Sequence, residues 1–202
     1  MRRRRLLLLF GAIAAVATAG ALALVSQAGK PPSLPPKGNL DLERATSFEP
    51  FTIYYAREAF EGLPLSAILR RLDRKLAREP VRADYVSFLY GDCDARPDFG
   101  CALPLEIQNW RVCARNPTAY ESAPGKLQPG DPIEVRGVPG RLYEAGERLE
   151  IYTGDTAIVL FGEREQILRA AEELQAVNAD VGPREPLQPP RPGALEGKLR
   201  CP

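Results

Sequence analysis

Four cysteines are the residues best suited to chemistry, and three of them lie in "YGDCDARPDFGCALPLEIQNWRVCAR", from Tyr90 to Arg115. Seven residues separate Cys93 from Cys101, and eleven separate Cys101 from Cys113. Structural zinc sites use closely spaced ligand pairs, and thiol redox centres use C-x-x-C. Neither spacing occurs here, and the sequence contains no histidine. Disulfide bonds are therefore the favoured interpretation, and no metal site is expected.

Four cysteines allow three pairings, which the sequence alone does not distinguish. We expect Cys93 to pair with Cys101 and, by elimination, Cys113 to pair with Cys201. A bridge that closes about nine residues stabilises by about 2.5 kcal/mol in the chain-entropy description, and one that closes about ninety by about 4.5 kcal/mol. Cys201 lies in a proline-rich tail, so its expected role is to hold that tail against the domain.

Carboxylates are the second group of residues that could carry a reaction. The lack of histidine removes Ser-His-Asp and Cys-His arrangements. A pair of carboxylates could still serve as the acid and base of a cell-envelope hydrolase. The carboxylates near expected strand ends are Asp92, Asp94, Glu106 and Asp155. Their simpler interpretation is solvated turn residues, because nothing in the sequence marks a pair or a cleft. No catalytic residue is assigned, and no cofactor is expected.

Trp110 is the single tryptophan, and it follows Gln108 at the end of an expected strand. An indole with an apolar body and one N–H donor is suited to ligand binding at a surface. Trp110 and Gln108 therefore form the candidate binding surface. The simpler interpretation is a half-buried structural indole.

The N-terminus predicts the location of the chain. Arg2–Arg5 precede twenty uncharged residues from Leu6 to Val25, which as a helix would span about 30 Å, the thickness of a bilayer core. The arginines should stay in the cytoplasm and the remainder should be exported. We favour a transmembrane anchor over residues 6–28, because the apolar run exceeds the usual length of a signal-peptide core. A signal peptide cleaved before Gly29 is the alternative, and it predicts the same side.

Export has consequences for partners and for the thiols. The compartment outside the membrane is oxidising, which favours disulfides. Without Arg2–Arg5 the basic count falls from 27 to 23 against 26 acidic residues, a net charge near −3. No nucleic-acid partner is expected, because no basic field attracts phosphates. The expected partners are the lipid bilayer, through the N-terminal helix, and an envelope protein or a cell-wall ligand.

Composition divides the chain into five segments. Residues 1–5 form the cytoplasmic end, 6–28 the anchor and 29–46 a linker that contains "KPPSLPPKGN". Proline-rich segments of this kind are extended spacers. Residues 47–180 form the extracytoplasmic domain, and 181–202 form an irregular proline-rich tail that ends near a cysteine.

Hydrophobic periodicity predicts the elements of the domain. Strands are expected over 50–56, 85–91 and 103–110, with the cysteine loop joining the last two. Helical spacing over Glu61–Glu79, with Pro64 in the first turn, places five apolar residues on one stripe: Leu65, Ile68, Leu69, Leu72 and Leu76. A meander follows, in which one strand ends at Gly137, the chain turns back at Ala145–Gly146, and an apolar strand runs from Asp155 after a tight turn at Gly154–Asp155. A helix over 163–177 ends the domain. The predicted class is α+β, a mostly antiparallel sheet with one or two helices packed on one face, preceded by a transmembrane helix.

A resemblance adds to this interpretation. The segments that carry it are "FEGLPLS", "YVSFLYGDC", "GCALPLEIQNW", "VCARN" and "YTGDTAIVLFG". They resemble a family of membrane-anchored or secreted actinobacterial proteins with no assigned activity, and the likeness covers most of Phe51–Val177. The part within residues 132–177 is also similar to the closing strand–strand–helix unit of extracytoplasmic lipoprotein-like domains attached to envelope regulators. The resemblance implies an extracytoplasmic location and transfers no catalytic residue.

Overall fold

The computed structural model describes residues 37–73, 83–92, 103–115, 130–143 and 146–201. They belong to the second of two compact units, Pro35–Pro202. The expected anchor over 6–28, the first part of the linker, and Cys93 and Cys101 lie outside the described residues. Within those residues, no helix has the length and apolarity needed to cross a membrane.

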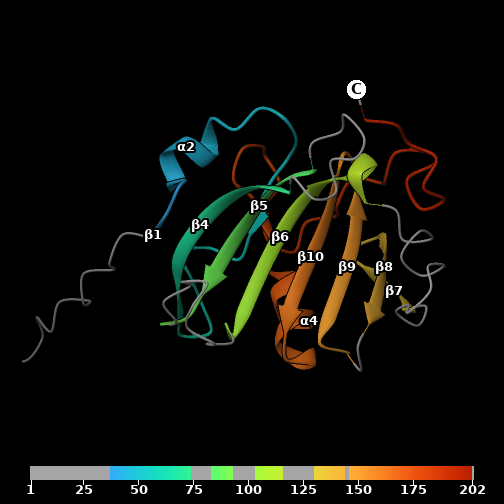
Figure 1. Cartoon of the computed structure of the whole chain (residues 1–202). Helices are drawn as coiled ribbons and strands as arrows, with labels where there is room; N and C mark the ends of the chain where they lie inside the picture. The colour runs from blue at the N-terminus through green and yellow to red at the C-terminus, as the bar shows by residue number, and fades with distance from the viewer. Residues whose placement is uncertain (1–36, 74–82, 93–102, 116–129, 144–145, 202) are drawn as a thin grey trace, which may run out of the picture. The chain divides into compact units, whose positions relative to one another are not determined.

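One large sheet organises the unit, with its strands in the order β1-β4-β5-β6-β10-β9-β8-β7 (Figure 1). The strands are β1 (Lys37–Gly38), β4 (Leu63–Asp73), β5 (Ala83–Tyr90), β6 (Leu105–Arg111), β7 (Asp131–Val135), β8 (Val138–Tyr143), β9 (Arg148–Thr153) and β10 (Thr156–Gly162). β3 (Ala59–Phe60) forms a hairpin with β4. Only β1 and β4 pair in parallel among these strands. The predicted α+β class with a mostly antiparallel sheet is confirmed.

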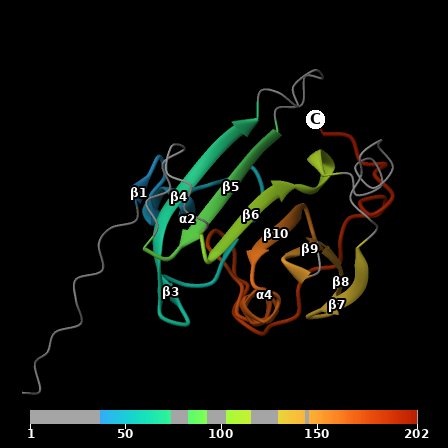
Figure 2. The ribbon, with the colours of Figure 1, turned by 60° about the horizontal axis from the view of Figure 1, so that its bottom comes forward.

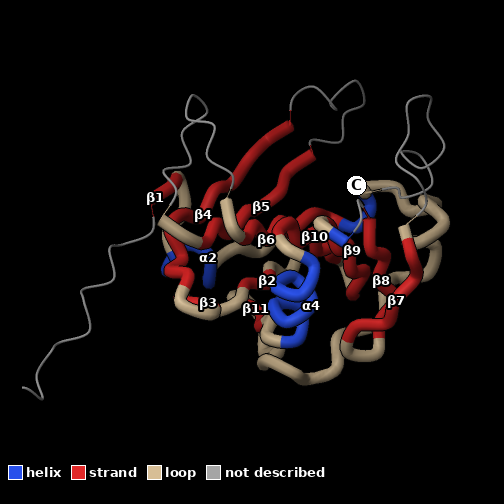
Figure 3. Tube along the Cα trace, turned by 90° about the horizontal axis from the view of Figure 1, so that it is seen from below, coloured by secondary structure: helices blue, strands red, loops and turns tan. Residues whose placement is uncertain are grey.

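The remaining elements are short. They are α2 (Leu42–Thr46), the two-residue strands β2 (Tyr54–Tyr55) and β11 (Gln175–Ala176), the 3-10 turn η1 (Val112–Ala114), and α4 (Arg164–Glu172). Figure 3 shows α4, β2 and β11 together on one face of the sheet. Ile167 and Leu174 are fully buried there with Ile158 and Leu160 of β10. The helix predicted over 163–177 is thus confirmed, although it ends at Glu172.

The helix predicted over Glu61–Glu79 is wrong, because Leu63–Asp73 form β4. Leu65 pairs with Tyr90 and Ala67 pairs with Leu89, so Ser66 is an extra residue in the ladder, a β-bulge. The extra residue turns Leu65 and Ile68 toward the same core although they are three positions apart. That spacing imitates the i, i+3 period of a helix. Pro64 pairs with Ala59 of the hairpin instead of starting a helix.

Residues 37–46, expected in the linker, are part of the domain. Gly38 pairs with Ile68 of β4. Asn39 donates from Nδ2 to the Arg70 carbonyl at 2.9 Å and accepts from the Arg70 N–H at 2.7 Å. One side-chain amide therefore takes the place of a neighbouring strand on this stretch of edge. Asp41 then caps α2 by accepting from the Arg44 N–H at 2.8 Å.

The opposite edge is β7. Its two-residue connection to β8, Arg136–Gly137, has φ values of 51° and 83°, which suit a tight hairpin turn. Val135 pairs with Val138 beside this turn. Because every second residue of an antiparallel strand bonds to the neighbouring strand, the backbone groups of Pro132 and Glu134 point away from β8. Pro132 has no N–H to present there. The turn predicted at Gly154–Asp155 is confirmed between β9 and β10.

The strand expected over 50–56 shortens to β2. Two side-chain amides hold this segment instead of a long ladder. Asn109 of β6 accepts from the Tyr54 N–H at 2.7 Å and donates to the Tyr54 carbonyl at 2.9 Å. Asn178 accepts from the Ile53 N–H at 2.9 Å. These bonds satisfy buried backbone groups and fix the chain that leads into β3.

The tail after residue 181 is irregular, as expected. Leu187 near its start packs in the same core as α4, whereas its last part packs on the opposite face of the sheet. Ala157 and Val159 point to that face, because they alternate with Ile158 and Leu160 along β10. They form a second core with Trp110, Tyr152 and the tail residues Ala194, Leu195 and Leu199. The predicted Cys113–Cys201 disulfide is confirmed. Figure 2 shows the C-terminal end beside η1, which contains Cys113.

Arg136 anchors the start of the tail. Its guanidinium donates to three backbone carbonyls: Leu174 at 2.5 Å, Glu185 at 2.6 Å and Gly182 at 2.8 Å. Burial lowers the pKa of Arg136, and the carbonyls compensate part of that desolvation by accepting from the charged form. This arginine therefore has a structural role.

Candidate functional site

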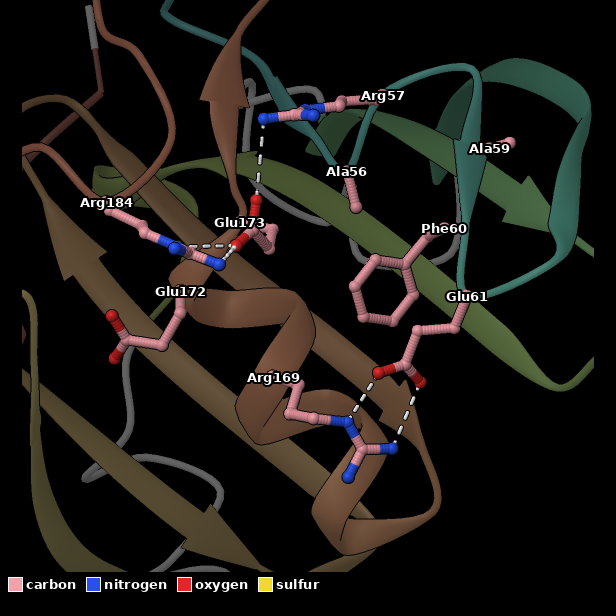
Figure 4. A pocket seen from close by; sticks show the side chains of 9 residues that line it. All are labelled: Ala56, Arg57, Ala59, Phe60, Glu61, Arg169, Glu172, Glu173 and Arg184. Atoms are coloured by element: carbon pink, nitrogen blue, oxygen red, sulfur yellow. Dashed lines mark hydrogen bonds and ion pairs between the residues drawn. The ribbon is translucent and has the colours of Figure 1, made fainter.

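A pocket of about 600 Å³ opens between the C-terminal half of α4 and the segment that contains β3 (Figure 4). We call it the α4 groove. Its lining consists of Ala56, Arg57, Ala59, Phe60, Glu61, Arg169, Glu172, Glu173 and Arg184. The groove therefore combines three alanine or phenylalanine side chains with three arginines and three glutamates.

The apolar side of the groove is fixed by a buried tyrosine. Ala56 is 1% exposed and Phe60 is 6% exposed. The Tyr90 hydroxyl accepts from the Ala56 N–H at 2.8 Å and donates to the Arg57 carbonyl at 3.1 Å. Burial raises the pKa of Tyr90 well above its usual value, so the hydroxyl keeps the proton that it donates. A side chain of β5 thus holds the backbone of Ala56 and Arg57, just before β3.

Ion pairs form the two rims of the groove. Arg169 binds Glu61 through Nε at 2.5 Å and Nη2 at 3.0 Å, and the hydrogen bond from Arg169 lowers the pKa of Glu61. Arg184 donates from Nε to Glu173 at 2.6 Å. Arg57 approaches the same carboxylate at 3.5 Å. Figure 4 shows the Phe60 ring between these two sets of charges.

Arg57 and Glu172 are the least engaged charges. The Arg57 side chain is 55% exposed and makes no hydrogen bond with any residue that the structure describes. Glu172 is exposed and takes part in no ion pair within the same described ranges. The formal charges of the six ionic side chains sum to zero. The groove therefore has no strong net field, and its selectivity must come from the position of individual charges.

Backbone strain is concentrated at this groove. Arg57 and Arg184 have φ values of 65° and 61°, in the left-handed region that favours glycine. Glu61, at 48°, is the first residue of the two-residue turn between β3 and β4, where this conformation is usual. A non-glycine residue held in this region outside such a turn costs about 1–3 kcal/mol. An exposed ion pair typically contributes at most about 1 kcal/mol. The pairs of Arg57 and Arg184 with Glu173 therefore do not readily offset the strain at those positions.

A second pocket of about 630 Å³ lies beside residues 46–52. Asn178 lines it, and its Nδ2 donates to the carbonyls of Phe48 and Phe51. Asp155 also lines it and pairs with Arg191 at 2.8 Å. These polar side chains thus already have partners in the chain, which makes this pocket the weaker candidate.

The structure places Trp110 and Gln108 in a packed network. Trp110 is 6% exposed and stacks on Tyr85 with ring centroids 3.9 Å apart. Its Nε1 donates to Gln108 Oε1 at 3.0 Å, and Gln108 donates to Glu106 at 3.0 Å. The indole therefore supports the second core, and most of its surface is covered.

The candidate carboxylates are not brought together. Glu106 pairs with Phe161 near one end of β6, whereas Asp155 precedes Thr156, which pairs with Arg111 at the other end. Five residues of strand separate these ends by about 17 Å. The two carboxylates of a glycosidase lie about 5–9.5 Å apart. Asp92 is exposed, and Asp94 lies outside the described residues.

A buried charge cluster lies on the face opposite α4. Glu150 is fully buried. Its carboxylate accepts from Arg115 at 2.5 Å and from the Tyr152 hydroxyl at 2.7 Å. Arg148 lies 3.7 Å from the same carboxylate. Arg115 also lies over the Trp110 ring, 5.0 Å from its centroid. Its burial makes this cluster a part of the second core.

The α4 groove was not predicted from the sequence. Glu61 and Arg169 are 108 positions apart, so no local spacing joins them. The signals present in the sequence were the charges around Phe60 and the Glu61-Gly62 turn. Both are equally typical of a solvated hairpin.

Comparison of the chain with protein-family models, curated proteins and solved structures gives no match. In the part of the chain that the structure describes, no three or more Cys, Asp or Glu side chains are grouped so as to hold a metal ion.

Proposed function

We propose that this chain is a membrane-anchored, extracytoplasmic binding module that holds a ligand of the cell envelope in the α4 groove. One observation carries the proposal. Two charged residues of the groove, Arg57 and Arg184, occupy backbone conformations that favour glycine and lie outside the hairpin turns. Strain of this kind gathers at ligand sites, where the side chain is needed despite its cost. Glu61 and Arg136 share the conformation, but each is the first residue of a two-residue hairpin turn, where this conformation is usual.

The location outside the membrane has independent support. Arg2–Arg5 and the uncharged run after them fit an anchor with a cytoplasmic N-terminus. The Cys113–Cys201 disulfide fits an oxidising compartment. A groove formed by prearranged side chains, with its backbone held by Tyr90, suits binding without a large rearrangement.

Protease added to intact spheroplasts should digest the domain, because everything after residue 28 is outside. Immunoblotting for the C-terminal half measures the loss. A cytoplasmic protein in the same cells should survive, which verifies that the membrane is sealed. A domain that is protected in intact spheroplasts and cut after lysis would contradict the proposed topology.

The groove itself can be tested in living cells with a photo-crosslinking residue. At Ala59, which is exposed and lines the groove, the residue should form adducts with an envelope component. Replacing both Arg57 and Arg184 with alanine should reduce those adducts at least about fivefold, if each contact is worth the usual amount for a charged hydrogen bond.

The matched control places the same crosslinker at Glu147, an exposed residue in the connection between β8 and β9. Adducts at Ala59 alone, lost in the double alanine variant, support the proposal. Equal adducts at both positions, or none at Ala59, would show that the groove is not the binding site.

A further inference from the structure

We infer that the α4 groove recognises a single carboxylate carried on a small apolar group, as at the C-terminus of a peptide that ends in alanine. The inference rests on the proposed function, since it names the ligand class of the same groove. It follows from three features: the positions of the arginines, the apolar surface beside them, and the glutamate side chains that line the groove.

Arg57 is the residue placed to receive the carboxylate. Its guanidinium contacts only Glu173, at 3.5 Å, and makes no hydrogen bond within the described part of the chain. Arg184 approaches the same glutamate from another side (Figure 4). The three side chains together carry a formal charge of +1. A carboxylate that binds Arg57 would neutralise this charge, and its two oxygens match the planar fork of a guanidinium.

The apolar side of the groove limits what can carry the carboxylate. Ala56, Ala59 and Phe60 line the groove on the side of β3. Ala59 is the exposed side chain among them, whereas Ala56 and Phe60 are nearly buried. The Phe60 ring separates the Arg57 rim from the Glu61–Arg169 rim. A methyl-bearing residue next to the carboxylate would contact this surface and exclude water from it.

The acidic side chains argue against other charged ligands. Glu61 is held by both Arg169 nitrogens and Glu173 by Arg184, so neither is available to a cation without breaking an existing pair. Glu172 is outside these pairs, and its negative charge interacts with the positive charge of Arg136. Three carboxylates also line the groove, and each would repel a doubly charged phosphate more strongly than a single carboxylate. The balance of charges therefore favours a monoanion.

The test uses the purified full chain in detergent micelles and isothermal titration calorimetry. The probes are N-acetyl-Ala-Ala as the free acid, the same dipeptide as its C-terminal amide, and inorganic phosphate. The free acid should bind at least about tenfold more tightly than the amide, as expected for one charge-assisted pair. Phosphate should bind more weakly than the acid.

Two variants at Arg57 locate the contact, and a third variant is the control. Arg57→Gln should bring the ratio of acid to amide affinity close to one, and Arg57→Lys should restore part of it. Arg71→Gln removes an exposed arginine of β4 outside the groove and should leave the ratio unchanged. Melting temperatures of all variants verify that each is folded.

Equal affinities for acid and amide, or tighter binding of phosphate, would overturn the inference. A ratio that survives Arg57→Gln would also overturn it, because the carboxylate would then be bound elsewhere. If crosslinks at Ala59 form in cells while the acid and amide bind alike, the binding module stands and only the ligand class is wrong. If the crosslinks are absent too, the proposed function itself fails.

Discussion

Replacing both Cys113 and Cys201 with serine is expected to lower the free energy of unfolding by about 4.5 kcal/mol. The bridge joins residues 88 positions apart, and removing a constraint of that length restores much entropy to the unfolded chain. Denaturant unfolding of the purified full chain in micelles, followed by tryptophan fluorescence, measures the change. Trp110 is a suitable reporter because it lies in the core that the tail covers.

The same variant should lose the end of its tail to trypsin sooner, since Lys198 and Arg200 lie within the segment that the bridge holds down. Replacing Cys93 and Cys101 with serine is the matched control, and a bridge closing so short a loop would contribute at most about 2–3 kcal/mol. A Cys113/Cys201 variant that is no less stable than this control would contradict the prediction. So would a tail that is cut equally fast in the unchanged protein.

Glu150→Leu is expected to destabilise the domain by about 3–5 kcal/mol, the usual loss when one partner of a buried ion pair is removed. The Glu150 side chain is fully buried, and those of Arg115 and Arg148 are only 19% and 10% exposed. Leucine would fill similar space but leave the Tyr152 hydroxyl and the positive charges without this acceptor. Thermal or denaturant unfolding measures the effect.

Glu134→Leu, at an exposed carboxylate of β7, is the control and should change stability by less than about 0.5 kcal/mol. Combining Glu150→Leu with Arg115→Met should recover part of the loss, because the second change removes a charge that the first left unneutralised. If the double variant lost as much stability as the two single variants together, Arg115 and Glu150 would not stabilise each other. A single-variant loss below about 1 kcal/mol would mean that solvent reaches the cluster.

The fold was predictable for the strands that hydrophobic burial covers on both faces. β5 and β10 have a core on each side, so most residues in both strands are apolar. β4 was mistaken for a helix because Ser66 inserts one residue and shifts the phase of the pattern. β1 and α2 were assigned to the linker because Asn39 and Asp41 secure them through side-chain hydrogen bonds. Such hydrogen bonds do not produce a periodic pattern of apolar residues in the sequence.

The candidate site was less predictable than the fold. Trp110 was chosen because a lone indole suits a binding surface, but the tail that covers it comes from more than 80 residues later in the chain. The α4 groove depends on charges that α4 and β3 bring together from distant positions. The count of cysteines leaves only three possible partners for Cys113, whereas no such count restricts the partner of an arginine.

The two edges of the sheet bear on how this protein behaves when many copies are crowded together. Strand edges with free backbone groups can recruit a second chain and start amyloid-like aggregation. Here the Asn39 amide occupies both backbone groups of Arg70 on one edge. On the other edge, Pro132 offers no donor, and Asp131 and Glu134 expose like charges to any second copy of the same strand. Edge-to-edge polymerisation is therefore disfavoured at both sides, so high local density need not lead to fibrils.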